Sequence, residues 1–183
     1  MVPTMGNLVT IDAWEREEGA PAPLGATWVQ QEQAWNFSLY SRTASAVTLL
    51  IYGAHDTVVP VLEVRLDPLV NKTGRLWHCL VSAARVPTAA YYAYRVDGPD
   101  GPTNRFRPAK VLCDPCAHRL FFPPTFSREA ARGEQANDGL AVLGVLPTPA
   151  WAAGAVPRPG PRHTHETVIY EMHVKGFTAR ANS

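Results

Sequence analysis

Two cysteines separated by two residues, Cys113 and Cys116, form the spacing in this sequence that most resembles a reactive or metal-binding motif. A structural zinc site needs four ligands, and here only His118 lies nearby, with no second pair of cysteines. A redox-active pair follows a strand and opens a helix in an α/β protein, which the surrounding sequence does not resemble. We therefore expect neither thiol to be catalytic or to hold a metal.

Histidines and aspartates offer the other candidate groups. His163 and His165 are separated by one residue, and His173 follows, but the first two lie in a Pro-rich segment where fixing a tetrahedral site would cost much chain entropy. Asp97 and Asp100 lie in a Gly- and Pro-rich turn, where aspartate is common because it bonds the nearby backbone. The sequence also has no Gly-rich phosphate loop. It thus predicts no metal, no cofactor and no catalytic residue.

Short strands are the elements that must position these groups. Apolar residues alternate with other residues in five runs, which is the two-residue period of strands with one face in a core. The apolar positions are Trp35, Phe37 and Leu39; Val47, Leu49 and Ile51; Leu62, Val64 and Leu66; Trp77, Cys79 and Val81; and Tyr92, Tyr94 and Val96. Asn36 and Ser38 alternate with the first run and are expected to face water. Turn residues separate the runs, so the predicted fold class is all-β, an immunoglobulin-like antiparallel β-sandwich.

The sequence divides into four expected segments. They are an N-terminal arm at 1–20, the β-sandwich at 21–120, a Pro-rich connector at 121–166 and a final strand-like segment at 167–183. Within the connector we expect one short helix near 127–134, and residues 152–161 are expected to be the least ordered. The apolar run at 167–174 is typical of a strand buried on both faces, as in a parallel sheet or barrel.

The overall composition excludes several function classes. Lys and Arg total 17 and Asp and Glu total 16, so the net charge is +1. A nearly neutral chain lacks the basic surface that nucleic acid or an anionic membrane would require. No apolar stretch is long enough to span a membrane, and the N-terminus does not resemble a signal peptide. Three cysteines, an odd number, favour a reducing compartment, so a cytoplasmic location is expected.

Four segments, in chain order, resemble the N-terminal region of isoamylases and bacterial glycogen-debranching enzymes of the α-amylase family. They are PLGA at 23–26 with WNFSL at 35–39, WH at 77–78 with YAYRVDGP at 92–99, NRFRPAKVLCDPCA at 104–117, and VIYEMHVKGFT at 168–178. Arg107, Cys113 and Cys116 stand where the family pattern has Asn, Leu and Tyr. These two cysteines therefore occupy ordinary structural positions of the resemblance.

The resemblance implies what a whole member of the family does and which part of such an enzyme this chain represents. Such enzymes hydrolyse α-1,6-glucosidic branch points of glycogen with two carboxylates, one a nucleophile and one an acid. These carboxylates follow later strands of a (β/α)₈ barrel, so they are expected beyond Ser183, and residues 167–183 are expected to hold the first strand of the truncated barrel. The chain would be a non-catalytic module, inactive alone, with the catalytic barrel as its partner in cis and α-glucan as substrate. The alternative is a stand-alone carbohydrate-binding or scaffold protein.

The resemblance also indicates where related modules bind sugar, and this chain lacks the expected ligand residue at all three positions, so no carbohydrate-binding residue is assigned. Related modules that bind glucans carry tryptophan in the loop equivalent to 53–57, lysine at the position of Ala93 and tryptophan after the turn, where this chain has Pro99 and Asp100. We expect Trp35, Trp77, Tyr92 and Tyr94 to fill the core or contact the barrel. An uncovered apolar face for the barrel is expected from Tyr91, Tyr92, Tyr94, Phe106, Phe121 and Phe122.

Overall fold

The computed structural model describes residues 18–102 and 104–150, together with the isolated residues 168, 171 and 173. The strand expected at 167–174 and the segment 152–161 lie outside these continuous ranges. Within the described residues, no helix has the length and apolar character needed to cross a membrane.

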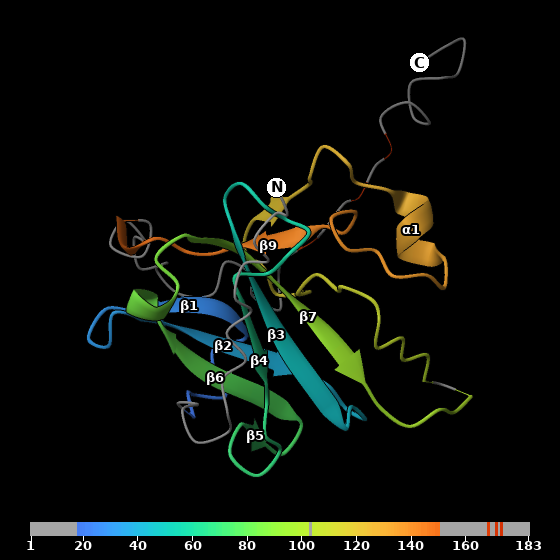
Figure 1. Ribbon diagram of the computed structural model, residues 1–183. Helices are drawn as coiled ribbons and strands as arrows, with labels where there is room; N and C mark the ends of the chain where they lie inside the picture. Colours follow the sequence, from blue (N-terminus) through green and yellow to red (C-terminus); the bar gives the residue numbers. More distant parts are fainter. Residues whose placement is uncertain (1–17, 103, 151–167, 169–170, 172, 174–183) are drawn as a thin grey trace, which may run out of the picture. The chain divides into compact units, whose positions relative to one another are not determined.

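Two antiparallel sheets pack face to face, with the strands of one crossing those of the other (Figure 1). The first sheet has the order β1 (Gly25–Val29), β2 (Ala34–Tyr40), β6 (Leu76–Ser82) and β5 (Lys72–Thr73). The second has the order β4 (Leu62–Arg65), β3 (Ala46–Gly53), β7 (Ala89–Asp97), β9 (Leu143–Val145) and β8 (Leu120–Phe121). The short helices are η2 (Ala83–Arg85) and α1 (Arg128–Arg132). The predicted β-sandwich is confirmed.

The main core lies between the sheets and contains the apolar residues that the alternation predicted. Trp77 is completely buried, and Trp35 is 8% exposed, with its indole Nε1 donating to the carbonyl of Pro147 at 2.8 Å. Tyr92 and Tyr94 of β7 lie opposite β3 residues that face the first sheet, so they are also buried there. The expectation that these two tyrosines belong to an uncovered face is therefore wrong.

The outer face of the first sheet is covered at Asn36 and Ser38, contrary to the sequence-based expectation for these residues. Both residues are buried, at 3% and 0% exposure. The Asn36 amide accepts from the backbone nitrogen of Ala20 at 2.7 Å and donates to its carbonyl at 3.0 Å, while Ser38 Oγ donates to the Pro21 carbonyl at 2.6 Å. Sequence alternation cannot reveal this because the covering segment is itself irregular and is held by polar contacts.

Replacing Asn36 with alanine is expected to lower the free energy of unfolding by about 1–3 kcal/mol, because a buried side chain and its two hydrogen bonds to the Ala20 backbone are lost. Urea denaturation followed by tryptophan fluorescence would measure this change. Gln30→Ala is the control, since Gln30 accepts the Trp28 indole proton at an exposed site and its loss should cost under about 0.5 kcal/mol. Equal losses in the two variants would contradict the role given to Asn36.

The stretch expected to be a connector after residue 120 contributes to the second sheet. β9 pairs with β7 on one side and with β8 on the other, and both pairings are antiparallel. The boundary expected at 120 therefore lies inside the sheet. The short helix appears where expected, as α1, and Ser127 caps it by accepting from the Ala130 nitrogen at 3.1 Å.

A second, smaller core lies on the outer face of the five-stranded sheet. It consists of the buried residues Leu50, Tyr52, Ala93, Val111, Ala141 and Leu143. The buried side chain of Asn137 fastens this layer, because its Oδ1 accepts from the Val111 nitrogen at 2.8 Å and its Nδ2 donates to the Val111 carbonyl at 3.1 Å. Both faces of this sheet are thus occupied by the chain itself.

Candidate functional site

The positions at which glucan-binding relatives carry their ligand residues do not form a sugar platform in the described residues. Ala93 is completely buried in the second core, so a side chain at this position cannot reach a ligand at the surface. In the loop 53–57, Asp56 accepts from the backbone nitrogens of Val58 and Val59 at 2.8 and 3.1 Å, which is a local turn role. Asp97 has a similar role, since its carboxylate accepts from the Gly98 nitrogen at 2.7 Å.

Asp114 is a buried carboxylate that sequence reasoning did not single out. It is 2% exposed, and it accepts from the Tyr92 hydroxyl at 3.0 Å and from the Cys116 nitrogen at 2.7 Å. Burial raises the pKa of Asp114, while those two hydrogen bonds and His118 act in the opposite direction. Burial and the nearby Asp114 carboxylate also raise the pKa of Tyr92. The pair anchors the 113–117 loop to β7, which is a structural role.

The two neighbouring cysteines differ in their surroundings. Both are free thiols; Cys113 is partly buried and Cys116 is exposed. Burial, with a further contribution from Asp114, raises the pKa of Cys113 to about 11. Because the thiolate is the nucleophile and the metal ligand, this shift opposes both reactivity and metal binding at neutral pH.

Alkylation with iodoacetamide at pH 8 is expected to modify Cys116 first, leaving Cys113 slow and the buried Cys79 protected until the chain unfolds. The Cys113 rate should rise about tenfold per pH unit between pH 8 and 9.5, because its thiolate fraction grows in that proportion below the pKa. Peptide mass spectrometry of timed samples would measure the rates. Cys113 reacting as fast as Cys116 at pH 8 would contradict this description.

The histidines of the described residues form no metal site. His163 and His165 lie outside the described residues. In the described part of the chain, no three histidine, cysteine or acidic side chains come together as metal ligands.

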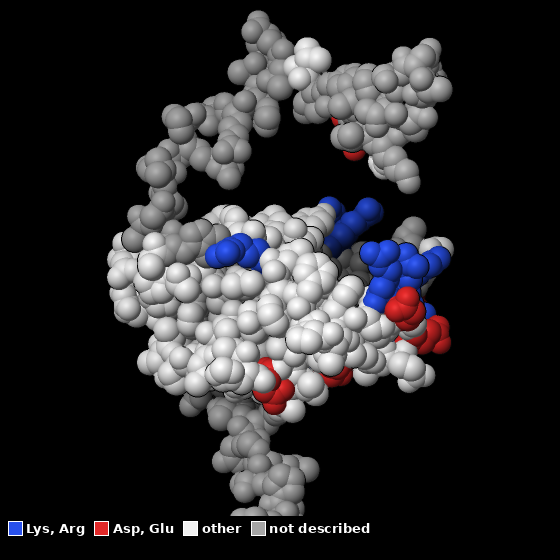
Figure 2. Space-filling model, turned by 90° about the horizontal axis from the view of Figure 1, so that it is seen from above, with Lys and Arg blue, Asp and Glu red and all other residues white. Residues whose placement is uncertain are grey.

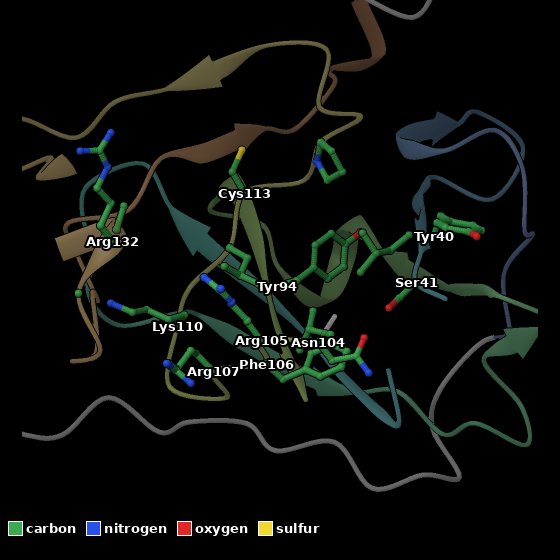
Figure 3. A pocket seen from close by; sticks show the side chains of 16 residues that line it. Tyr40, Ser41, Tyr94, Asn104, Arg105, Phe106, Arg107, Lys110, Cys113 and Arg132 are labelled. Atoms are coloured by element: carbon green, nitrogen blue, oxygen red, sulfur yellow. The ribbon is translucent and has the colours of Figure 1, made fainter. Parts of the chain in front are cut away.

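A pocket of about 600 Å³ lies between the end of β2, the edge of β7, the segment after β7 and helix α1 (Figure 3). Asn104 helps to fix its wall, because it accepts from the Thr43 hydroxyl at 3.1 Å and donates to the Pro99 carbonyl at 3.3 Å. Gly98 is required in the adjoining turn, since a Cβ there would come within 2.4 Å of the Phe106 ring. Half of the lining residues come from 104–115, which lies within the longest segment of the resemblance, 104–117.

Comparison with known protein families shows to which family this sandwich belongs. Residues 23–117 match the family described as carbohydrate-binding module 48, the isoamylase N-terminal domain. The chain belongs to this family. The match covers the sandwich from β1 through the 113–117 loop, and so includes three of the four segments on which the resemblance rested.

Curated relatives of this isoamylase N-terminal domain are much longer than the chain. Isoamylase SU1 from Zea mays is 32% identical over 173 residues, which cover 90% of this chain and 21% of the relative. A glycogen debranching enzyme from Erwinia tasmaniensis is 36% identical over 170 residues, which cover 88% of this chain and 24% of the relative. The chain thus spans between a fifth and a quarter of the length of these relatives.

A solved structure shares the fold of the isoamylase N-terminal domain. The catalytic module of the glycogen-degrading pneumococcal virulence factor SpuA superposes with a TM-score of 0.50 at 17% sequence identity. The superposition covers 73% of this chain and 17% of that chain, and it supports the β-sandwich alone.

Proposed function

We propose that this chain is the N-terminal module of a debranching glycoside hydrolase that acts on α-1,6-glucosidic branch points of glycogen or related glucans. The observation that carries the proposal is the sequence identity of 32–36% with isoamylases and glycogen debranching enzymes over about nine-tenths of the chain. In this proposal the catalytic carboxylates belong to a barrel domain that partners the module in cis. No residue of this chain is assigned a catalytic role. The cytoplasm, a reducing compartment, remains the location proposed.

The module is proposed to act by packing on the barrel and not by capturing glucan itself. Buried Ala93 and the layer of Val111, Ala141 and Leu143 above the sheet leave no room for the lysine-centred sugar platform of glucan-binding relatives. No specific observation favours the alternative of a stand-alone glucan-binding protein.

An exposed aromatic cluster beside β8 is the proposed contact surface for the barrel. Phe122 is 55% exposed and packs edge-to-face on Phe126 at 5.2 Å, and Leu120 is 50% exposed. Next to them, the rings of Tyr91 and Phe121 stack with their centroids 4.2 Å apart, and this contact fixes the position of the cluster. The side of the molecule viewed in Figure 2 is mostly uncharged, with a group of basic and acidic residues at the right and a separate basic residue at the left. Exposed aromatic side chains that are held in place by their neighbours are typical anchors of protein interfaces.

The test is to assay the 183-residue chain alone and together with a debranching-enzyme barrel that lacks its own N-terminal module. Alone, the chain is expected to release no reducing sugar from a glycogen limit dextrin and to show no saturable binding of maltoheptaose by calorimetry. Mixed with the barrel, it is expected to bind and to raise hydrolysis. Saturable micromolar binding of maltoheptaose without any effect on the barrel would instead support the stand-alone glucan-binding protein.

A surface variant sharpens this test. Leu120→Asp with Phe122→Asp should abolish binding to the barrel, because two charges would be buried without partners. Leu69→Asp is the control, because Leu69 is 92% exposed in the turn between β4 and β5. This turn is far from the proposed contact surface, since β5 and β9 lie at opposite ends of the sandwich in Figure 1. Equal binding by both variants would place the interface elsewhere.

A further inference from the structure

The pocket beside α1 has an unusual charge distribution for a chain whose net charge is +1. Its described lining residues include four basic side chains, Arg105, Arg107, Lys110 and Arg132, and no acidic one. In Figure 3 these four lie on one side of the pocket, with Tyr40 and Ser41 on the other. Cations from the 104–115 segment and from α1 are therefore gathered at one cavity that is not part of the expected sugar platform.

Two of these cations have little local compensation. Among the described residues, the side chains of Arg105 and Arg132 have no hydrogen bond or ion pair. Arg107 does pair with Glu134, at 3.0 Å, but both partners are well exposed, so the pair stabilises little.

Lys110 adds a nearly buried charge to the same wall. It is 4% exposed, and its Nζ donates to the Ala130 carbonyl at 2.5 Å without a carboxylate partner in the described residues. A buried ammonium group that is bonded only to a neutral carbonyl keeps an unbalanced charge, which a bound anion would balance.

We propose that this pocket binds a phosphate monoester of a sugar. Guanidinium groups match the oxygens of a phosphate in a forked geometry, which Arg105 and Arg132 are free to supply. The volume of about 600 Å³ lies in the range of small-molecule sites and exceeds what inorganic phosphate would fill. The ring of Phe106 in the lining is partly exposed and offers apolar surface for a sugar ring. The sugar part rests on the proposed function in glucan metabolism, whereas the anion part rests on the pocket alone.

The experiment titrates the 183-residue chain with four probes by calorimetry: glucose 6-phosphate, a maltooligosaccharide carrying one phosphate ester, inorganic phosphate and maltose. Saturable binding of the first two, tighter than binding of phosphate and of maltose, is the expected result. Tighter binding of the phosphorylated oligosaccharide than of glucose 6-phosphate would identify a phosphorylated glucan as the source, and the reverse order would identify a free sugar phosphate. Raised salt should weaken binding of both phosphate esters.

Paired variants separate the pocket from general electrostatic attraction. Arg105→Gln with Arg132→Gln is expected to weaken binding of glucose 6-phosphate by about tenfold or more, because charge-assisted hydrogen bonds are lost. Arg65→Gln with Arg128→Gln removes the same charge from β4 and from α1 outside the pocket lining, and it should change affinity by less than about twofold. Thermal unfolding of both variants checks that the fold is intact.

Three results would overturn the proposal: no saturable binding of either phosphate ester, equal losses in the two double variants, or maltose binding as tightly as glucose 6-phosphate. If inorganic phosphate bound as tightly as glucose 6-phosphate, the sugar part would be wrong. None of these outcomes bears on the barrel-mixing experiment, so failure here is distinguishable from failure of the proposed debranching role.

Discussion

Ala93→Lys, which introduces the lysine that glucan-binding relatives carry, is expected to unfold the module and not to create a sugar site. Ala93 lies on β7 and is completely buried beneath the covering layer, so the added side chain would clash with Val111 and Leu143 and bury an unpaired ammonium group. The cost is on the order of 5 kcal/mol, which is comparable to the whole stability of a small domain. Circular dichroism during thermal unfolding would measure the loss.

The pH dependence of this variant offers a second readout. Burial lowers the pKa of a lysine, so the unfolded state of the variant binds more protons than the folded state at neutral pH. Its stability relative to the original chain should therefore rise as the pH increases toward 10. A variant that stays folded at pH 7 and binds maltoheptaose would show that the covering layer opens to expose the strand.

Arg95→Lys is the matched control for Ala93→Lys. Arg95 lies two residues along the same strand, on the same face, and its guanidinium contacts Glu63 at 3.3 Å and Asp138 at 2.5 Å. A lysine at this position keeps a cation near two carboxylates, so the expected cost is about 1 kcal/mol or less. A large loss in this control would show that the outer face of β7 tolerates no change at all.

Trp35→Ala is expected to lower the free energy of unfolding by about 3–5 kcal/mol, the usual range for a buried aromatic residue in a core. The side chain is 8% exposed, packs edge-to-face on Trp28 with ring centroids 5.3 Å apart, and binds the Pro147 carbonyl. Its removal would leave a cavity and free the segment after β9. Urea denaturation followed by circular dichroism would give the value.

Trp35→Phe separates packing from hydrogen bonding at the same site. It keeps an aromatic ring but loses the indole donor, so the expected cost is about 1–3 kcal/mol, between the original chain and Trp35→Ala. If both variants lost the same stability, the hydrogen bond to Pro147 would carry most of the effect. If neither lost more than about 1 kcal/mol, the position given to Trp35 in the core would be wrong.

Much of the sandwich was predictable because strand alternation records burial on one face. Trp35, Phe37 and Leu39, like Val47, Leu49 and Ile51, face the core as their two-residue period indicated. The same rule failed for Asn36 and Ser38, which an irregular segment covers through hydrogen bonds. It also could not anticipate β9, because a three-residue strand is too short to show a period.

The candidate site was less accessible to sequence reasoning than the fold. The resemblance of 104–117 to the family indicated that the segment matters, but not that Arg105 and Lys110 would meet Arg132 from α1 at one pocket. Nor did the sequence reveal that Asp114, within this segment, is buried as the partner of Tyr92. Such relations join residues about twenty or more positions apart, and no local pattern records them.

The sequence by itself determined the all-β class, the strands of the main core and the family, because alternation and motif order survive in the linear chain. Only the tertiary structure decided that Ala93 lies beneath the chain's own covering layer and that the basic side chains share a cavity. The physical reason is that burial of one segment by another depends on long-range packing and on hydrogen bonds between distant segments. The two bonds between the Asn137 side chain and the Val111 backbone are an example. These contacts form only when the two sheets and the segment after β8 have come together.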